Sequence, residues 1–254
     1  MVSRVDTQIP FLASLSPESR EVVLDLATQL KVPRGERMFS VGDPAEQCYL
    51  ILQGKVKLVR LARNQPQVVP HPQRKPTLPP RRRRIDPPPA RESLLWLMGP
   101  GDMFGELSVF DQGTRSTAAR TVTESVLLRF EADELAAMVN DRPDVTSAML
   151  AQLATRLRRR DDQAAGMVLS DVPGRVAWLI LHLHERFGVP GDPATGTPPS
   201  VRHDLTQSEI AQMVGASRET VNKALTDFEK RDIIEVRPKE FRLLQPQRLL
   251  ARTD

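Results

Sequence analysis

A glycine-containing turn near the middle of the chain carries side chains that could hold an anion. The run Gly101-Asp-Met-Phe-Gly-Glu-Leu-Ser108 is followed by Arg115 and Ser116. Gly105 lets the backbone approach a ligand closely, and the amides of such a turn attract negative charge. Arg115 adds a charge-assisted, bidentate phosphate contact, and Glu106 is an acceptor suited to a ribose hydroxyl. The combination favours a cyclic nucleotide, whereas an ion pair between Glu106 and Arg115 is the purely structural alternative.

A second run, from Leu205 to Leu225, has the spacing of two short helices joined by a tight turn. Thr206 and Glu209 form a capping box that begins the first helix. Gly215 permits the left-handed residue that ends it, and Ser217 can cap the second helix. This pattern is typical of a helix-turn-helix, whose second helix enters the major groove of double-stranded DNA. The residues predicted to contact DNA are Thr206, Gln207, Ser217, Arg218, Glu219, Thr220 and Lys223.

The second helix begins with side chains that can read bases. Arg218 can bond O6 and N7 of guanine, and Glu219 can accept from N4 of cytosine. Lys223, one turn further along, can reach a base or a phosphate. An arginine and a glutamate on an exposed helix usually form only a solvated face, but the doubly capped setting around a glycine turn favours DNA. A hairpin around Arg237 and Lys239 is predicted to act as a wing near the DNA backbone.

Length and composition limit the kind of protein in which these residues can lie. The chain has 254 residues, which suits one large domain or two modest ones, and an apolar content of 40%, ordinary for a globular protein. No run approaches the roughly 18 apolar residues of a membrane span, and the first residues lack a secretory pattern. We therefore expect a cytoplasmic protein with no membrane partner.

The same composition argues against chemistry at cysteine or at a metal. Cys48 is the single cysteine, which excludes an internal disulfide and a cysteine-based zinc or iron–sulfur site, and so disfavours a redox sensor. The four histidines are too scattered to predict a metal site. No nucleophile–base pair or P-loop is recognisable, so we expect no catalytic residues and no enzymatic activity.

In the N-terminal part, residues 1–140, the sequence predicts short strands separated by turns. Turn signals recur at Gly35, Gly42, Gly54 and the run 99–102. Seven or eight strands at this spacing predict an antiparallel β-barrel or jelly roll. A leading helix is predicted from Ser16 to about Leu30, because a serine followed by proline is a helix start.

The segment Asn64–Ser93 interrupts this series of strands. It holds nine of the 22 prolines and seven basic residues against two acidic ones, so the basic balance of the chain, net +4, belongs to this segment. Strand patterns at 49–61 and 94–98 flank it, which predicts a β-hairpin with a long, disordered insertion at its tip. Either the insertion is a tolerated solvated loop, or Arg81–Arg84 touches DNA phosphates or an acidic partner.

Beyond about Glu131 the apolar period becomes helical. A long helix is predicted within 141–170, with apolar residues at every fourth position from Val145 to Leu157. A helix of about 27 residues exceeds what a small domain covers, so we expect a homodimer along it. Asp171 then restarts the chain as a helix to Phe187, a loop follows to Ser200, and helix is expected up to about Arg231. Two strands at 233–236 and 241–244 complete a predicted winged helix-turn-helix domain over 171–254, which makes the fold class α+β.

These motifs resemble those of the Crp/Fnr family of transcription regulators, and its cyclic-AMP receptor branch in actinobacteria in particular. The run Gly215-Ala-Ser-Arg-Glu-Thr-Val-Asn-Lys223 is similar to that branch's recognition helix, and Asp171-Val-Pro-Gly-Arg175 to its inter-domain joint. The turn residues Phe104, Gly105, Glu106, Leu107, Ser108, Arg115 and Ser116 fall on its phosphate-binding cassette. The resemblance implies a dimer that binds a palindrome like TGTGA-N6-TCACA, responds to cyclic AMP and acts on RNA polymerase.

The long helix departs from that pattern at the base-contacting positions. Arg156 matches the family, but Arg160 and Asp161 stand where the branch has two small polar residues that contact adenine. Three alternatives stay open: cyclic AMP binds with altered geometry, another nucleotide such as cyclic GMP binds, or Arg160 and Asp161 pair across the dimer and hold a ligand-independent form. In the last case the chain is an apo-active or architectural DNA-binding protein.

Overall fold

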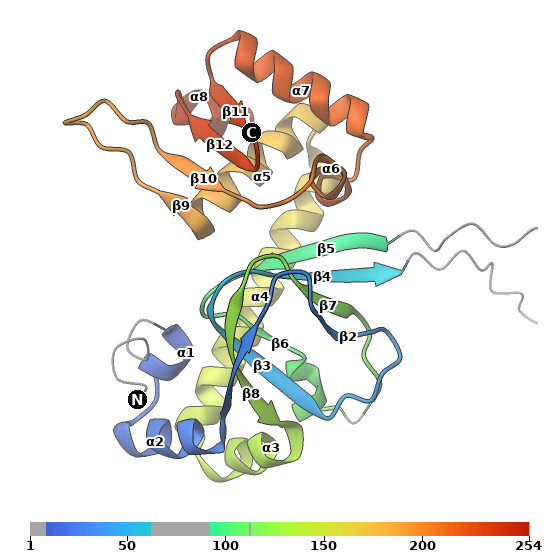
Figure 1. The fold of residues 1–254 in the computed structure, drawn as a ribbon, viewed down its shortest axis with the longest axis vertical. Coiled ribbons are helices and arrows are strands. Elements are labelled where there is room, and N and C mark those ends of the chain that lie inside the picture. The colour runs from blue at the N-terminus through green and yellow to red at the C-terminus, as the bar shows by residue number, and fades with distance from the viewer. Residues whose placement is uncertain (1–8, 62–91, 112, 254) are drawn as a thin grey trace, which may run out of the picture.

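The structure is a computed structural model that describes residues 9–61, 92–111 and 113–253. Its lower half in Figure 1 is the predicted strand-rich domain, and its upper half is a small helical domain. The long helix α4 (Pro143–Leu169) runs up the first domain, and α5 (Val172–Phe187) continues into the second. The predicted α+β class, with a sheet domain, a long helix and a winged helix-turn-helix, is confirmed.

The N-terminal domain contains two four-stranded antiparallel sheets, which is the two-sheet form of the predicted barrel or jelly roll. One sheet has the order β1-β8-β3-β6 and the other β2-β7-β4-β5. Aromatic side chains of both sheets meet between them, with Tyr49 stacked on Phe104 at 4.9 Å and Phe39 at 6.0 Å from Phe104. The strands are β1 (Thr28–Val32), β2 (Arg37–Phe39), β3 (Gln47–Gln53), β4 (Val56–Leu61), β5 (Glu92–Met98), β6 (Met103–Phe104), β7 (Ala118–Thr121) and β8 (Ser125–Glu131).

Three short helices cover this domain: α1 (Pro10–Ala13), α2 (Pro17–Leu26) and α3 (Ala132–Asp141). Ser16 caps α2 as predicted, since its side chain accepts from the Ser19 N–H. The prediction that this helix reaches Leu30 is wrong. It ends at Leu26 because residues 28–32 pair as a strand with 125–129 of β8, and tertiary pairing overrides local propensity.

The predicted hairpin around the insertion is confirmed by the pairing of β4 with β5, from Val56 opposite Met98 to Leu61 opposite Glu92. Strand β5 begins at Glu92, two residues before the predicted strand, so the boundary of the insertion at Ser93 is wrong. Residues 64–91, with the proposed contacts of Arg81–Arg84, lie outside the described residues.

The C-terminal domain places a helix-turn-helix on a small sheet of order β11-β12-β10-β9. Asp171 caps α5 by accepting from the Gly174 N–H. Residues 200–202 form strand β10 where the end of a loop and then helix were expected, because Val201 pairs with Phe241 of the wing. The wing strands lie one residue from their predicted positions. The elements are β9 (Gly188–Val189), β10 (Ser200–Arg202), α6 (Gln207–Val214), α7 (Arg218–Lys230), β11 (Ile234–Arg237), β12 (Glu240–Leu243) and α8 (Pro246–Leu250).

The long helix α4 leaves some of its apolar residues uncovered. Val145 and Met149 are fully buried against the N-terminal domain, but Leu150 and Leu157 are 58% and 60% exposed. Among the helices that the structure describes, none combines the length and apolar character needed to cross a membrane.

Candidate functional site

A cavity of about 400 Å³ lies beside the 3-10 helix at Glu106–Val109, the element that follows the predicted anion-binding turn. Eight of the ten predicted residues line it together: Gly105, Glu106, Leu107, Ser108, Arg115, Ser116, Arg156 and Arg160. The cavity therefore brings together side chains from the turn, from the loop before β7 and from the long helix.

Arg115 supplies buried positive charge to this cavity. The side chain is only 7% exposed, and its guanidinium lies 4.2 Å from the ring centre of Phe39. It donates to the backbone carbonyls of Gly105 and Gln47. Its Nε is buried and has no hydrogen-bond partner among the described residues. Buried donors normally have acceptors, and Arg115 lines the cavity, so its guanidinium fits an anionic group such as a phosphate.

Gly105 is required where it stands for two reasons. Its φ of +74° lies in the left-handed region, which other residues adopt only with strain. A Cβ there would lie 2.6 Å from Nη1 of Arg115. A larger residue would therefore displace the guanidinium, so the glycine and the arginine form one unit.

Glu106 pairs with the long helix rather than with Arg115. Its side chain is 6% exposed, and its carboxylate forms an ion pair with the Arg156 guanidinium. The structural alternative of a Glu106–Arg115 pair is not the arrangement that the structure shows. The Arg156 ion pair holds the carboxylate that a ribose hydroxyl would bond. Because Glu106 and Arg156 both line the cavity, a ligand at this position would lie next to the turn and to α4.

The two residues that depart from the family pattern have different surroundings. Arg160 lines the cavity, and burial lowers its pKa, with the like charge of Arg156 as the next cause. Asp161 is exposed on α4 and is not among the residues that line the cavity. Phe104 is also not on the wall, because it is buried in the aromatic stack beneath the turn.

Several wall residues were not predicted from the sequence. Phe39 comes from β2, Arg60 from β4, Trp96 from β5 and Gln163 from α4. Trp96 lies opposite Leu58 in the β4–β5 pairing, so strand alternation could have placed both on one face. Phe39 had no local signal, since its contact with Arg115 depends on the pairing of β2 with β7.

The helix-turn-helix has the predicted local geometry. Thr206 accepts from the Glu209 N–H while the Glu209 side chain accepts from the Thr206 N–H, which completes the capping box. Gly215 ends α6 at φ +68°, and Ser217 caps α7 by accepting from the Thr220 N–H.

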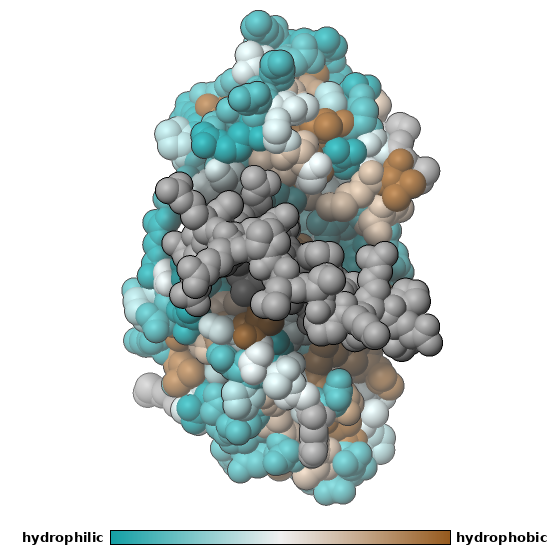
Figure 2. All heavy atoms as spheres, turned by 90° about the vertical axis from the view of Figure 1, so that its right-hand side faces the viewer, coloured by the Kyte–Doolittle hydropathy of each residue, from teal (hydrophilic) through white to brown (hydrophobic). Residues whose placement is uncertain are grey.

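The DNA-contacting candidates share an accessible surface. Ser217, Arg218, Glu219, Thr220 and Lys223 are all exposed on the first two turns of α7, and Thr206 and Gln207 are exposed at the start of α6. On the face drawn in Figure 2, the upper part of the molecule, which carries this domain, is mainly hydrophilic. The side chain of Gln207 accepts from Asn222 of α7 at 3.3 Å, which ties the two helices together. In the wing, Arg237 pairs with Glu235 at 2.7 Å.

Comparisons with known proteins match both domains. A model of the Crp-like helix-turn-helix domain matches residues 174–252, and a model of the cyclic nucleotide-binding domain matches residues 84–142. A CRP-like cAMP-activated global transcriptional regulator of Mycobacterium tuberculosis is 42% identical over 220 residues, which are 87% of this chain and 85% of that protein. The Cyclic AMP receptor protein of Thermus thermophilus is 28% identical over 229 residues, 90% of this chain and 89% of the relative.

The fold is also shared with solved structures. FixK2 from Bradyrhizobium japonicum superposes with a TM-score of 0.70 at 20% identity, over 90% of this chain and 98% of that one. At this identity the likeness concerns the fold alone, and the identity and coverage of the mycobacterial relative decide the family. The chain belongs to the Crp/Fnr family of transcription regulators.

Proposed function

We propose that this chain is a DNA-binding transcription regulator whose operator affinity is controlled by a cyclic nucleotide, with cyclic AMP the first candidate. The observation that carries the proposal is the position of α4. Arg156, Arg160 and Gln163 of this helix line the anion-binding cavity, and the same helix leads through Asp171 into the DNA-reading domain. A ligand that contacts α4 can therefore bias where the helix-turn-helix sits.

The donors around the cavity support a phosphate-bearing ligand. Arg115 offers its guanidinium, Ser116 its hydroxyl and the turn its backbone amides, while the Glu106 carboxylate is an acceptor for a sugar hydroxyl. The names of the mycobacterial and Thermus relatives, which describe cyclic-AMP-dependent proteins, support the choice of nucleotide.

The uncovered apolar residues of α4 support a homodimer. Leu150 and Leu157 are both more than half exposed. They lie seven residues apart, which is the spacing of apolar contacts between two parallel helices of a coiled coil. A twofold dimer would present two copies of α7, matched to a palindrome of the TGTGA type with half-sites about 34 Å apart. RNA polymerase is the partner that this role implies.

The test is sedimentation of the protein with a duplex that carries a TGTGA-N6-TCACA palindrome, at saturating cyclic AMP. We expect two protomers per duplex, and a clear loss of affinity when one half-site is scrambled. Leu157→Glu should shift the free protein toward a monomer, whereas Val189→Glu, a similarly exposed position outside α4, should not. One protomer per duplex, or equal affinity for intact and half-scrambled sites, contradicts the proposal.

A further inference from the structure

The DNA-reading domain lies directly against the hairpin β4–β5 of the N-terminal domain. In Figure 1, α6 sits above β5, and the two elements are in contact. Leu94 and Leu97 of β5 are 2% and 3% exposed and belong to the same hydrophobic cluster as Ile210 and Val214 of α6. The Leu94 N–H donates to the Gln212 side chain at 3.0 Å. One continuous core therefore spans the two domains.

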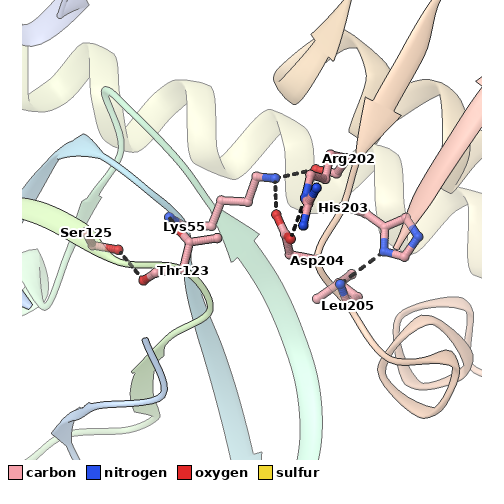
Figure 3. Close-up of polar contacts among 7 residues, drawn as sticks. All are labelled: Lys55, Thr123, Ser125, Arg202, His203, Asp204 and Leu205. Carbon is pink, nitrogen blue, oxygen red and sulfur yellow. Dashed lines mark hydrogen bonds and ion pairs between the residues drawn. The ribbon is translucent and has the colours of Figure 1, made fainter. Parts of the chain in front are cut away.

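Two lysines of the N-terminal domain reach across this contact to two carboxylates at or just before the start of α6. The Lys55 ammonium bonds Asp204 at 2.9 Å and also the carbonyl of Arg202 (Figure 3). The Lys57 ammonium bonds Glu209. All four side chains are at most 18% exposed, so these pairs are largely removed from water and are screened less by salt than surface pairs.

The backbone around Lys55 is itself held in place. Its N–H donates to Thr123 Oγ1 at 2.9 Å, and its carbonyl accepts from the Val122 N–H at 2.7 Å. On the other side, Asp204 adopts a positive φ of 59° next to His203, whose Nδ1 accepts from the Leu205 N–H (Figure 3). Both ends of the Lys55–Asp204 pair are thus fixed by their own domains, which favours one defined docking geometry.

The Glu209 side chain makes two interactions, one within its own helix and one with the N-terminal domain. It is the third residue of α6 and closes the capping box on Thr206, and it is also the partner of Lys57. In helix-turn-helix complexes the first helix crosses the DNA backbone. The docked hairpin therefore restrains the first turn of α6, although the predicted DNA contacts of α6 and α7 stay exposed, so docking would limit DNA binding through the orientation of these helices and not by covering them.

We propose that Lys55 and Lys57 form an ionic clamp that docks the helix-turn-helix on the β4–β5 hairpin in a form with low DNA affinity. The helix-turn-helix cannot turn away from the N-terminal domain without breaking both pairs and the Gln212–Leu94 bond. The clamp therefore sets part of the free energy that a ligand must supply to separate α6 and α7 from the β4–β5 hairpin.

Hydrogen exchange of β5, without nucleotide or DNA, tests the docking itself. β5 is the edge strand of its sheet, and its Leu94 amide bonds Gln212 of the other domain, so undocking exposes it. Lys57→Gln removes the cation, and Glu209→Gln removes the carboxylate charge while keeping a residue that completes a capping box. Lys31→Gln, an exposed position in β1, is the matched control.

We expect the peptide that contains Leu94 to exchange about tenfold faster in Lys57→Gln and Glu209→Gln than in the wild type, and at the wild-type rate in Lys31→Gln. Equal rates in all four proteins overturn the clamp. A second measurement rests on the proposed function: without nucleotide, Lys57→Gln should bind the palindrome about tenfold more tightly than wild type or Lys31→Gln. Unchanged affinity overturns the link to DNA binding. The exchange result is independent of that function, so the two failures are distinguishable.

Discussion

Replacing Arg115 with methionine removes the guanidinium from the wall of the cavity proposed to bind the nucleotide while keeping a long side chain. Arg115 is 7% exposed, packs on Phe39 and has an Nε without a partner in the described part of the chain. A phosphate that entered the cavity would receive charge-assisted hydrogen bonds from this group, each worth about 1.5–3 kcal/mol. Two such bonds set an upper bound of about 6 kcal/mol.

The net effect is smaller because the guanidinium already donates to the carbonyls of Gly105 and Gln47. Turning toward a ligand gives up part of those bonds, so we take the lower end, about 3 kcal/mol, which is roughly a hundredfold in Kd. Arg115→Lys keeps the charge but loses the planar fork, so its loss should be intermediate, about tenfold.

Isothermal titration calorimetry with cyclic AMP measures these losses. Arg37→Met, an exposed arginine of β2 that does not line the cavity, is the control and should bind like the wild type. Urea unfolding shows whether each variant is folded at the titration temperature. A folded Arg115→Met protein that binds within twofold of the wild type would refute the assignment of Arg115 to the phosphate.

Three further predictions concern the reading domain. Arg218→Ala should weaken operator binding by about 1–3 kcal/mol and relax the preference for guanine at one position, which competition with point-substituted duplexes measures; an equal loss on every duplex would argue against base reading. Gly215→Ala should lower the free energy of unfolding by about 1 kcal/mol, because φ is +68° while the nearest atom to an added Cβ, in Met167, is 3.9 Å away; unchanged urea unfolding would contradict this. Burial lowers the pKa of His203 to about 4, so below its ordinary value of 6.5 the unfolded chain binds a proton that the folded chain does not, and stability falls as the pH decreases through that window. His203→Asn should therefore lose about 2 kcal/mol less than the wild type between pH 7 and pH 5, and identical pH profiles would exclude His203 as the cause.

Local sequence signals predicted the parts of this fold that local chemistry determines. Ser16, Asp171, Thr206 and Ser217 each cap a helix as predicted, because a cap needs only a side-chain oxygen and an amide three residues on. The length of α4 and the β4–β5 hairpin also followed from periodicity and from the composition of the segment between the strands.

Features that depend on distant pairing could not be read from the sequence. Residues 28–32 continue a helical pattern locally but become a strand because β8 offers them a partner. Val201 enters a strand for the same reason, through Phe241. In the site, the ion pair of Glu106 with Arg156 joins residues 50 apart, so spacing could not choose it over a pair with Arg115.

The contact between the two domains could not be predicted from the sequence. Lys55 and Lys57 alternate with Val56 and Leu58, a pattern typical of the solvent face of a strand, and Glu209 has the position of a capping residue. Their pairing requires the whole C-terminal domain to be placed on β4–β5. Charged residues in an amphipathic pattern predict only that they avoid the domain's own core, and a second domain can still cover them.

The central claim is that a nucleotide in the cavity of Arg115 changes how the helices that carry Arg218 meet DNA. Its most direct test is an anisotropy titration of the TGTGA palindrome with the wild-type protein and Arg115→Met, each without nucleotide, with cyclic AMP and with cyclic GMP. We predict that one nucleotide tightens wild-type binding at least fivefold and leaves Arg115→Met unchanged. Equal operator affinity of the wild-type protein under all three conditions would contradict the account and favour a ligand-independent DNA-binding protein.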